Sequence, residues 1–191
     1  MIPIPPQAFG RLTPADRTNM FASSYIYNFP FFKNRRGIVG QALGHWTFSG
    51  MTALESGFPL TISLATPTAG LATRPNCIGT VGRLKNLNEW FNTGAFAAPE
   101  FGFFGNCGTS IVRGPGEEVW DWSLFKTFPI GERFRLQFRG EIFNIWNHPN
   151  FSGVATGYAG TNSTGQLIGN FGEVVSAEDP REVQLALRLS F

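Results

Sequence analysis

Residues 132–144, ERFRLQFRGEIFN, alternate between apolar and polar side chains over most of their length. One set of alternate positions holds Phe134, Leu136, Phe138, Gly140 and Ile142, and the other holds Arg133, Arg135, Gln137, Arg139, Glu141 and Phe143. A helix would mix the two sets around its circumference, whereas a strand places each set on its own face. The stretch therefore predicts a β-strand with one apolar and one polar face.

The same period continues on the N-terminal side of this strand. VWDWSLFKTF at 119–128 sets Trp120, Trp122, Leu124 and Phe128 against Asp121, Ser123, Phe125 and Thr127. The link PIGE at 129–132 is short enough for a turn. Residues 119–144 therefore predict a β-hairpin.

Three further stretches predict strands. The chain ends on EVQLALRLSF at 182–191, whose apolar face is Val183, Leu185, Leu187, Leu189 and Phe191. HWTFSGMTALES at 45–56 and RTNMFASSYIYNF at 17–29 are also β-prone, the second with a less polar opposite face. The fold class expected is all-β, an antiparallel meander of about five strands with little helix.

Composition excludes several classes of protein. The 191 residues include 20 Phe and 23 Gly, which favours strands and turns over helices. The net charge of +2 comes from scattered, balanced charges, so nucleic acid is not an expected partner. No apolar run is long enough for a transmembrane helix. The N-terminal stretch MIPIPPQAFG lacks the features of a signal peptide.

The connections between the predicted strands alternate in length. They are short at 129–132, moderate at about 30–44, and long and rich in Gly, Pro and Asn at about 59–117 and 146–180. Long loops are uncommon inside compact domains. Outer-membrane β-barrels, however, have short periplasmic turns, long extracellular loops, and strands with one lipid-facing and one lumen-facing side. The pattern favours part of a transmembrane β-barrel.

The aromatic residues support this interpretation. If the chain ends on the periplasmic side, Trp120, Trp122 and Trp146 fall at the outer interface, and Phe128, Phe134 and Phe191 at the inner one. Two aromatic girdles of this kind are typical of membrane barrels. Lys126 fits less well, because it falls on the lipid-facing side, although near the periplasmic end it could snorkel to the interface. A soluble β-sandwich shows the same alternation and remains the alternative.

No catalytic or metal-binding constellation emerges from the sequence. His45 and His148 are the only histidines, and neither has Cys or carboxylate neighbours at ligand spacing. Neither a nucleophile elbow nor a phosphate-binding glycine loop is present. We therefore expect no enzymatic activity, no cofactor and no metal.

A set of motifs resembles the C-terminal barrel end of TonB-dependent outer-membrane receptors, most closely the Oar-like group with a carboxypeptidase-regulatory-like N-terminal domain. The motifs are SGFPLTI at 56–62, RPN at 74–76, WFNTGAFAAP at 90–99, FGNCG at 104–108, IVRGPG at 111–116, WDWSLFKTF at 120–128, RLQFRGEIFNIWNHPNF at 135–151 and DPREVQLALRLSF at 179–191. Each motif is weak alone, but their shared order is specific. The resemblance implies energised uptake of a ligand too large or too scarce for porins, driven through a plug domain and TonB.

The resemblance also implies a role for the chain's end. In this family the last strand closes the barrel, and its terminal aromatic residue is similar to the signal read by the barrel-assembly machinery. That signal would here comprise the apolar face of 182–191, ending on Phe191.

This chain departs from the family in extent. Family members carry a signal peptide, a plug and about 22 strands, whereas about five strands and no plug are recognised here. The expected organisation is an irregular lead at 1–15 followed by a C-terminal barrel segment at 16–191, an incomplete barrel from a longer receptor. A soluble secreted β-domain for carbohydrate binding or adhesion is the alternative function.

Two groups of residues are candidates for contact with a ligand. The polar face of the strands would line the lumen with Asp121, Arg135, Arg139, Glu141 and Arg188. These are either ordinary solvated lumen residues or contacts to a plug or ligand. Because recognition on such scaffolds is carried by loops, Trp90, Phe103, Phe104 and Tyr158 in the long connections are the preferred ligand contacts.

Cys77 and Cys107, the only two cysteines, fall in the same long connection. The related sequences usually carry neither, so the two look like a pair gained together, and a surface loop of an outer-membrane protein lies in an oxidising environment. We expect a Cys77–Cys107 disulfide that rigidifies a Gly-rich segment with little core of its own. Two buried free thiols are the alternative.

Overall fold

The computed structural model describes residues 13–32, 37–66 and 73–191. The chain divides into two compact units. The strand unit comprises 19–55, 118–149 and 179–191, and the loop unit comprises the described parts of 1–18, 56–117 and 150–178.

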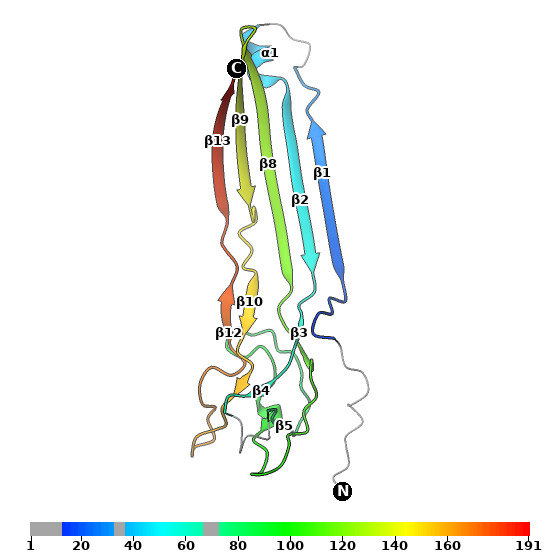
Figure 1. Ribbon diagram of the computed structural model, residues 1–191, viewed down its shortest axis with the longest axis vertical. Coiled ribbons are helices and arrows are strands. Elements are labelled where there is room, and N and C mark those ends of the chain that lie inside the picture. The colour runs from blue at the N-terminus through cyan, green and yellow to red at the C-terminus, as the bar shows by residue number, and fades with distance from the viewer. Residues whose placement is uncertain (1–12, 33–36, 67–72) are drawn as a thin grey trace. The chain divides into compact units, whose positions relative to one another are not determined.

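The strand unit is one antiparallel sheet of five strands (Figure 1). Its strands, in sheet order, are β1 (Met20–Asn28), β2 (Trp46–Glu55), β8 (Glu117–Ile130), β9 (Phe134–Phe143) and β13 (Glu182–Ser190). All five predicted strands are therefore present, and the sheet does not close into a barrel within the described part of the chain. β1 and β13 are its edges.

The register keeps the faces predicted from alternation continuous across neighbouring strands. Val183 and Trp122 both pair with Ile142, and Leu187 and Lys126 both pair with Phe138. Toward the other edge of the sheet Phe21 pairs with Leu54 and Tyr27 with Phe48, so the aromatic positions of β1 and β2 share a face. This is the same face as that of Trp122, whose ring contacts Phe48. A slip of one residue would move every side chain of a strand to the opposite face of the sheet. The match of apolar positions between neighbouring strands therefore specifies this register.

The turn after β8 and the longer β1–β2 connection lie at the end of the sheet where the chain terminates (Figure 1). Gly131 has φ 66° in the turn, a conformation that glycine adopts without steric cost. The β1–β2 connection contains a short helix, α1 (Ile38–Leu43), which alternation could not predict. No helix in the described ranges is both long and apolar enough to cross a membrane.

The two long connections are not open loops, because together they form the loop unit with its own core. Its short elements are β3 (Pro59–Leu60), β4 (Ser63–Leu64), β5 (Asn76–Cys77), η2 (Thr93–Ala95), β6 (Phe96–Ala97), β7 (Val112–Arg113), β10 (Phe151–Val154), β11 (Gly157–Tyr158) and β12 (Val174–Ala177). The ring of Phe171 lies 5.2 Å from both Phe91 and Tyr158, centroid to centroid. The expectation of a segment with little core was therefore wrong, since aromatic residues from both connections pack together.

Candidate functional site

The polar face of the sheet brings the predicted lumen-facing residues onto one surface. Arg135, Arg139 and Glu141 occupy alternate positions of β9. Arg188 of β13 pairs with Gln137 of the same set, and Glu141 pairs with Ser123, two residues after Asp121 on β8. The sheet therefore presents guanidinium groups, carboxylates and hydroxyls side by side.

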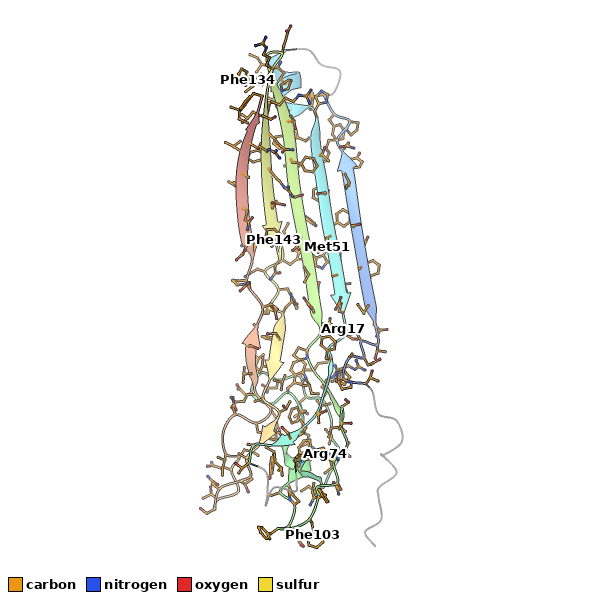
Figure 2. All side chains as sticks on the ribbon, viewed as in Figure 1. Arg17, Met51, Arg74, Phe103, Phe134 and Phe143 are labelled. Atoms are coloured by element: carbon orange, nitrogen blue, oxygen red, sulfur yellow. A yellow bond between two sulfur atoms is a disulfide. The ribbon has the colours of Figure 1, made fainter. Side chains whose placement is uncertain are left out.

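A shallow hollow of about 620 Å³ lies along this part of the sheet. Most of the residues that border it belong to the polar face: Ser24, Ile26, Ser49, Met51, Asp121, Ser123, Glu141 and Phe143. Met51 and Phe143 mark the middle of the sheet and the end of β9 in Figure 2. The hollow is open and mixed in polarity, which suits a polar surface of a ligand or domain better than a small enclosed substrate.

Hydrogen bonds already engage several polar groups of this face. The hydroxyls of Ser49 and Ser123 lie 2.6 Å apart and link β2 to β8. Arg139 Nη2 donates to Glu141 Oε1 at 2.7 Å, and the main-chain N–H of Asn144 donates to Asp121 Oδ1 at 3.0 Å. Within 13–32, 37–66 and 73–191, no group of three or more His, Cys, Asp or Glu side chains is placed to hold a metal ion. The arrangement can recognise polar groups by hydrogen bonding and charge.

At one end of the apolar face, three tryptophans form a cluster. The ring of Trp146 lies 6.5 Å from Trp120 and 5.9 Å from Trp122. Trp122 Nε1 also donates to the Tyr25 hydroxyl at 2.9 Å. At the opposite end, Phe128 pairs with Leu136, and Phe134 opens β9 next to the turn (Figure 2). Trp120, Trp122 and Trp146 therefore lie toward one end and Phe128 and Phe134 toward the other, while Tyr25 and Phe138 lie midway along β1 and β9.

Lys126 lies on the apolar face but does not reach out from it, which corrects the expectation that it snorkels. Its residue surface is only 2 % exposed. Nζ donates to the main-chain carbonyls of Gln41, Ala42 and Gly44 at the C-terminal end of α1, the Ala42 distance being 3.0 Å. A cation is favoured there because unpaired carbonyls give a helix C-terminus partial negative charge.

Two of the four predicted ligand-contacting residues, Trp90 and Tyr158, are buried and not at the surface. Trp90 is 7 % exposed and Tyr158 is 5 % exposed, because both belong to the core of the loop unit. Trp90 Nε1 also donates to the Arg113 carbonyl at 2.9 Å. These two side chains therefore stabilise the unit and do not contact a ligand at its surface.

The other two, Phe103 and Phe104, are exposed. Their exposed fractions are 53 % and 71 %, and Phe101 beside them is exposed as well. Figure 2 shows Phe103 at the outer end of the loop that carries it. Three exposed phenylalanines close together in sequence form a patch, called here the FGFF patch after residues 101–104.

A disulfide joins Cys77 to Cys107, the pairing expected from the sequence. The Cα atoms are 5.0 Å apart, within the usual range for such bonds. Around it, Cys77 N–H donates to Asn106 Oδ1 at 2.7 Å, and Asn106 N–H donates to Asn76 Oδ1 at 3.0 Å. The bond and these reciprocal contacts fix the base of the loop bearing the FGFF patch.

Sequence reasoning missed an ion pair in the loop unit. Arg113 Nη2 donates to Asp16 Oδ2 at 2.7 Å, and its Nη1 donates to the Gly57 carbonyl at 2.9 Å. The hydrogen bond from Arg113 is the main cause that holds the pKa of Asp16 below its usual value. Gly57 is required here, since a Cβ would lie 2.1 Å from the Pro115 carbonyl oxygen. The close approach of the SGFP and VRGPG segments therefore requires glycine at position 57. The spacing of the two motifs in the sequence could not show this approach.

A family model described as an outer membrane beta barrel domain matches residues 7–184. Neither the curated proteins nor the solved structures contain a significant match.

Proposed function

The chain belongs to the outer membrane beta barrel domain family, and on that premise we propose that it forms part of the barrel of a TonB-dependent transporter of the Oar-like group. Its location is the bacterial outer membrane. The proposed activity is energised uptake of a ligand too large or too scarce for porins, with a plug domain and TonB as partners in the whole receptor. In this role the chain forms part of the barrel and a surface that recognises the ligand, and it does not catalyse a reaction.

The observation that carries the proposal is the two-faced sheet. One face is mostly apolar from β1 to β13, with Ser23, Thr52 and Lys126 as its polar positions, and its exposed residues include Leu185 and Leu187 of β13. The other face holds the charged and hydroxyl groups around the 620 Å³ hollow. Barrel strands of this kind meet lipid with the first face and the lumen with the second. A soluble secreted β-domain would leave the apolar face in water.

In this proposal the chain's end lies on the periplasmic side. The β8–β9 turn and the C-terminus share one end of the sheet, while both long connections leave from the other end. Short turns face the periplasm and long loops the exterior in outer-membrane barrels. The loop unit would then carry the FGFF patch outside the cell, where exposed aromatic rings make the first contact with a ligand.

Thiol labelling of the full receptor in intact cells tests the orientation. Thr164→Cys in the loop unit should react with a membrane-impermeant maleimide from outside, and Glu132→Cys in the β8–β9 turn should react only after the outer membrane is opened. Both positions are exposed, so burial does not confound the comparison. The reverse pattern would refute the orientation.

Copurification tests the transport assignment. The detergent-solubilised receptor should bind the periplasmic domain of TonB, and a variant lacking the TonB-contacting segment should not. A receptor that fractionates with the outer membrane but never binds TonB would be a barrel of another class.

A further inference from the structure

An apolar crevice lies beside α1 in the strand unit. Its volume is about 350 Å³, and its lining residues are Phe29, Phe31, Phe32, Leu43, Trp46 and Leu124. All six side chains are apolar, so they offer no hydrogen-bonding or charged group to a charged or strongly polar ligand. An apolar chain is the chemistry that fits it.

The position of α1 shows which side of the sheet the crevice is on. Lys126 points from the apolar face of β8, and its Nζ donates to the carbonyls that end α1. Trp46 Nε1 also donates to the Ala42 carbonyl at 3.2 Å. These contacts hold α1 against the apolar face, so the crevice opens on the same side as the rows on β9 and β13.

The helix adds further apolar surface there. Ile38, Val39 and Leu43 are all exposed, while its buried residue is Gly40. An exposed apolar helix is unfavourable in water and suits the boundary between acyl chains and headgroups. The crevice is thus continuous with the lipid-facing surface of an outer-membrane protein.

We propose that this crevice binds one acyl chain of a phospholipid in the periplasmic leaflet. The proposal rests on the proposed barrel orientation, because α1 lies at the end of the sheet assigned to the periplasm (Figure 1). Flexible acyl chains fill gaps between rings, and the aromatic side chains Phe29, Phe31 and Trp46 supply the walls. The bound lipid would complete the packing of α1 against the barrel.

Photolabelling tests the proposal. The full receptor is reconstituted into vesicles of phosphatidylethanolamine and phosphatidylglycerol that contain a small fraction of phosphatidylethanolamine with a diazirine on one acyl chain. After illumination, labelled residues are mapped by mass spectrometry. We expect several-fold more label on Phe29, Phe31 and Leu43 than on Leu185 and Leu189, which face bulk lipid.

Two variants separate a site from general lipid contact. Leu43→Gln should lower labelling of Phe29 and Phe31 several-fold and leave Leu185 unchanged. Leu187→Gln, at another exposed apolar position, on β13, should leave the crevice labelling unchanged. Unchanged labelling at Leu185 also shows that the Leu43 variant has folded.

The outcomes distinguish this proposal from the barrel assignment. Label on β13 but no excess in the crevice would overturn the lipid site alone. No label on either surface would overturn both the site and the lipid-facing sheet.

Discussion

At the scale of single residues, Lys126 shows how a cation is accommodated on the apolar face of the sheet. On a face that meets lipid, an uncompensated Lys costs about 2–4 kcal/mol at the bilayer midplane and about 0–1 kcal/mol near the interfaces. The ammonium has three donors, and the carbonyls of Gln41, Ala42 and Gly44 provide three acceptors. The rings of Phe128 and Trp46 lie 4.7 Å and 5.4 Å from Nζ and shield it further. The lysine therefore fastens α1 to the sheet.

We predict that Lys126→Met destabilises the receptor by about 1.5–3 kcal/mol, the usual contribution of hydrogen bonds to a charged group. The methionine side chain is unbranched like lysine and only slightly shorter, but it leaves the carbonyls at the end of α1 without donors. Chemical unfolding of receptor in lipid vesicles, followed by tryptophan fluorescence, measures the loss. Arg188→Met on the exposed polar face of β13 is the control and should change little. Equal stability of the two variants would contradict the prediction.

The Asp16–Arg113 pair predicts a pH effect in the loop unit. Because the pKa of Asp16 is lowered from 3.8 in the folded state, the pair stabilises the unit above that pH and loses its effect as pH falls through the lowered value. The protection of the loop unit's amides against hydrogen exchange, relative to the intrinsic exchange rate at each pH, should therefore decrease as the pH falls below 3.8. This loss of protection should be smaller in Asp16→Asn and unaltered in Glu100→Gln, an exposed acid of the same unit. Identical acid responses in all three proteins would exclude the linkage.

At the scale of elements, the sequence predicted what depends on local period and missed what depends on distant contacts. Alternation predicted the strands at 119–128, 133–144 and 182–191 and their faces, because a strand's side chains have a fixed period of two, and β-propensity added those at 17–29 and 45–56. It could not predict the core of the loop unit, where Phe91 meets Phe171 from another connection. For the same reason the expectation that Trp90 and Tyr158 lie at the surface is wrong, since exposed and buried aromatic residues have the same sequence pattern in an irregular stretch.

The short helix was missed for a different reason. α1 has six residues, no side-chain cap at its N-terminus and no acidic residue in its first turn. Such a helix carries no start signal in sequence and depends on tertiary contacts. The hydrogen bonds from Lys126 to the carbonyls that end α1 supply that support. Lys126 does not fit the alternation of a barrel strand because it binds this helix.

The disulfide gives a prediction at this scale. Replacing both Cys77 and Cys107 with Ser should destabilise the loop unit by about 3–4 kcal/mol, because the bond closes a long segment in the unfolded chain. Protease susceptibility of residues 73–117 should rise, whereas assembly of the receptor in the outer membrane should not change. Phe103→Ala in the same loop removes only an exposed ring and is the control. Protection equal to wild type in the double variant would show that the loop core alone suffices.

At the scale of the whole molecule, the sheet has an apolar face and two edges. β1 and β13 each have one neighbour among the described strands, so each presents unpaired main-chain groups on its other side. Open, apolar edges promote association between chains. A lipid environment would cover the apolar face, and further strands would pair with the main-chain groups of the two edges.

We therefore expect the 191-residue chain, expressed alone, to aggregate in buffer and to require detergent. Size-exclusion chromatography with and without detergent measures this directly. A monodisperse monomer that unfolds cooperatively in plain buffer would instead support a soluble β-domain.

The end of the chain gives the last prediction. Phe191 follows β13 directly and is 97 % exposed, so its ring makes almost no contact within the strand unit. Deleting it should therefore cost little stability, although an exposed terminal aromatic on an alternating strand suits capture by the barrel-assembly machinery. In the full receptor, Phe191→Ala should reduce the amount assembled in the outer membrane several-fold and leave ligand affinity and unfolding of the assembled molecules unchanged. Ser190→Ala is the matched control, because it alters the neighbouring polar-face position. Assembly at wild-type level in Phe191→Ala would show that the terminal ring is not part of the signal.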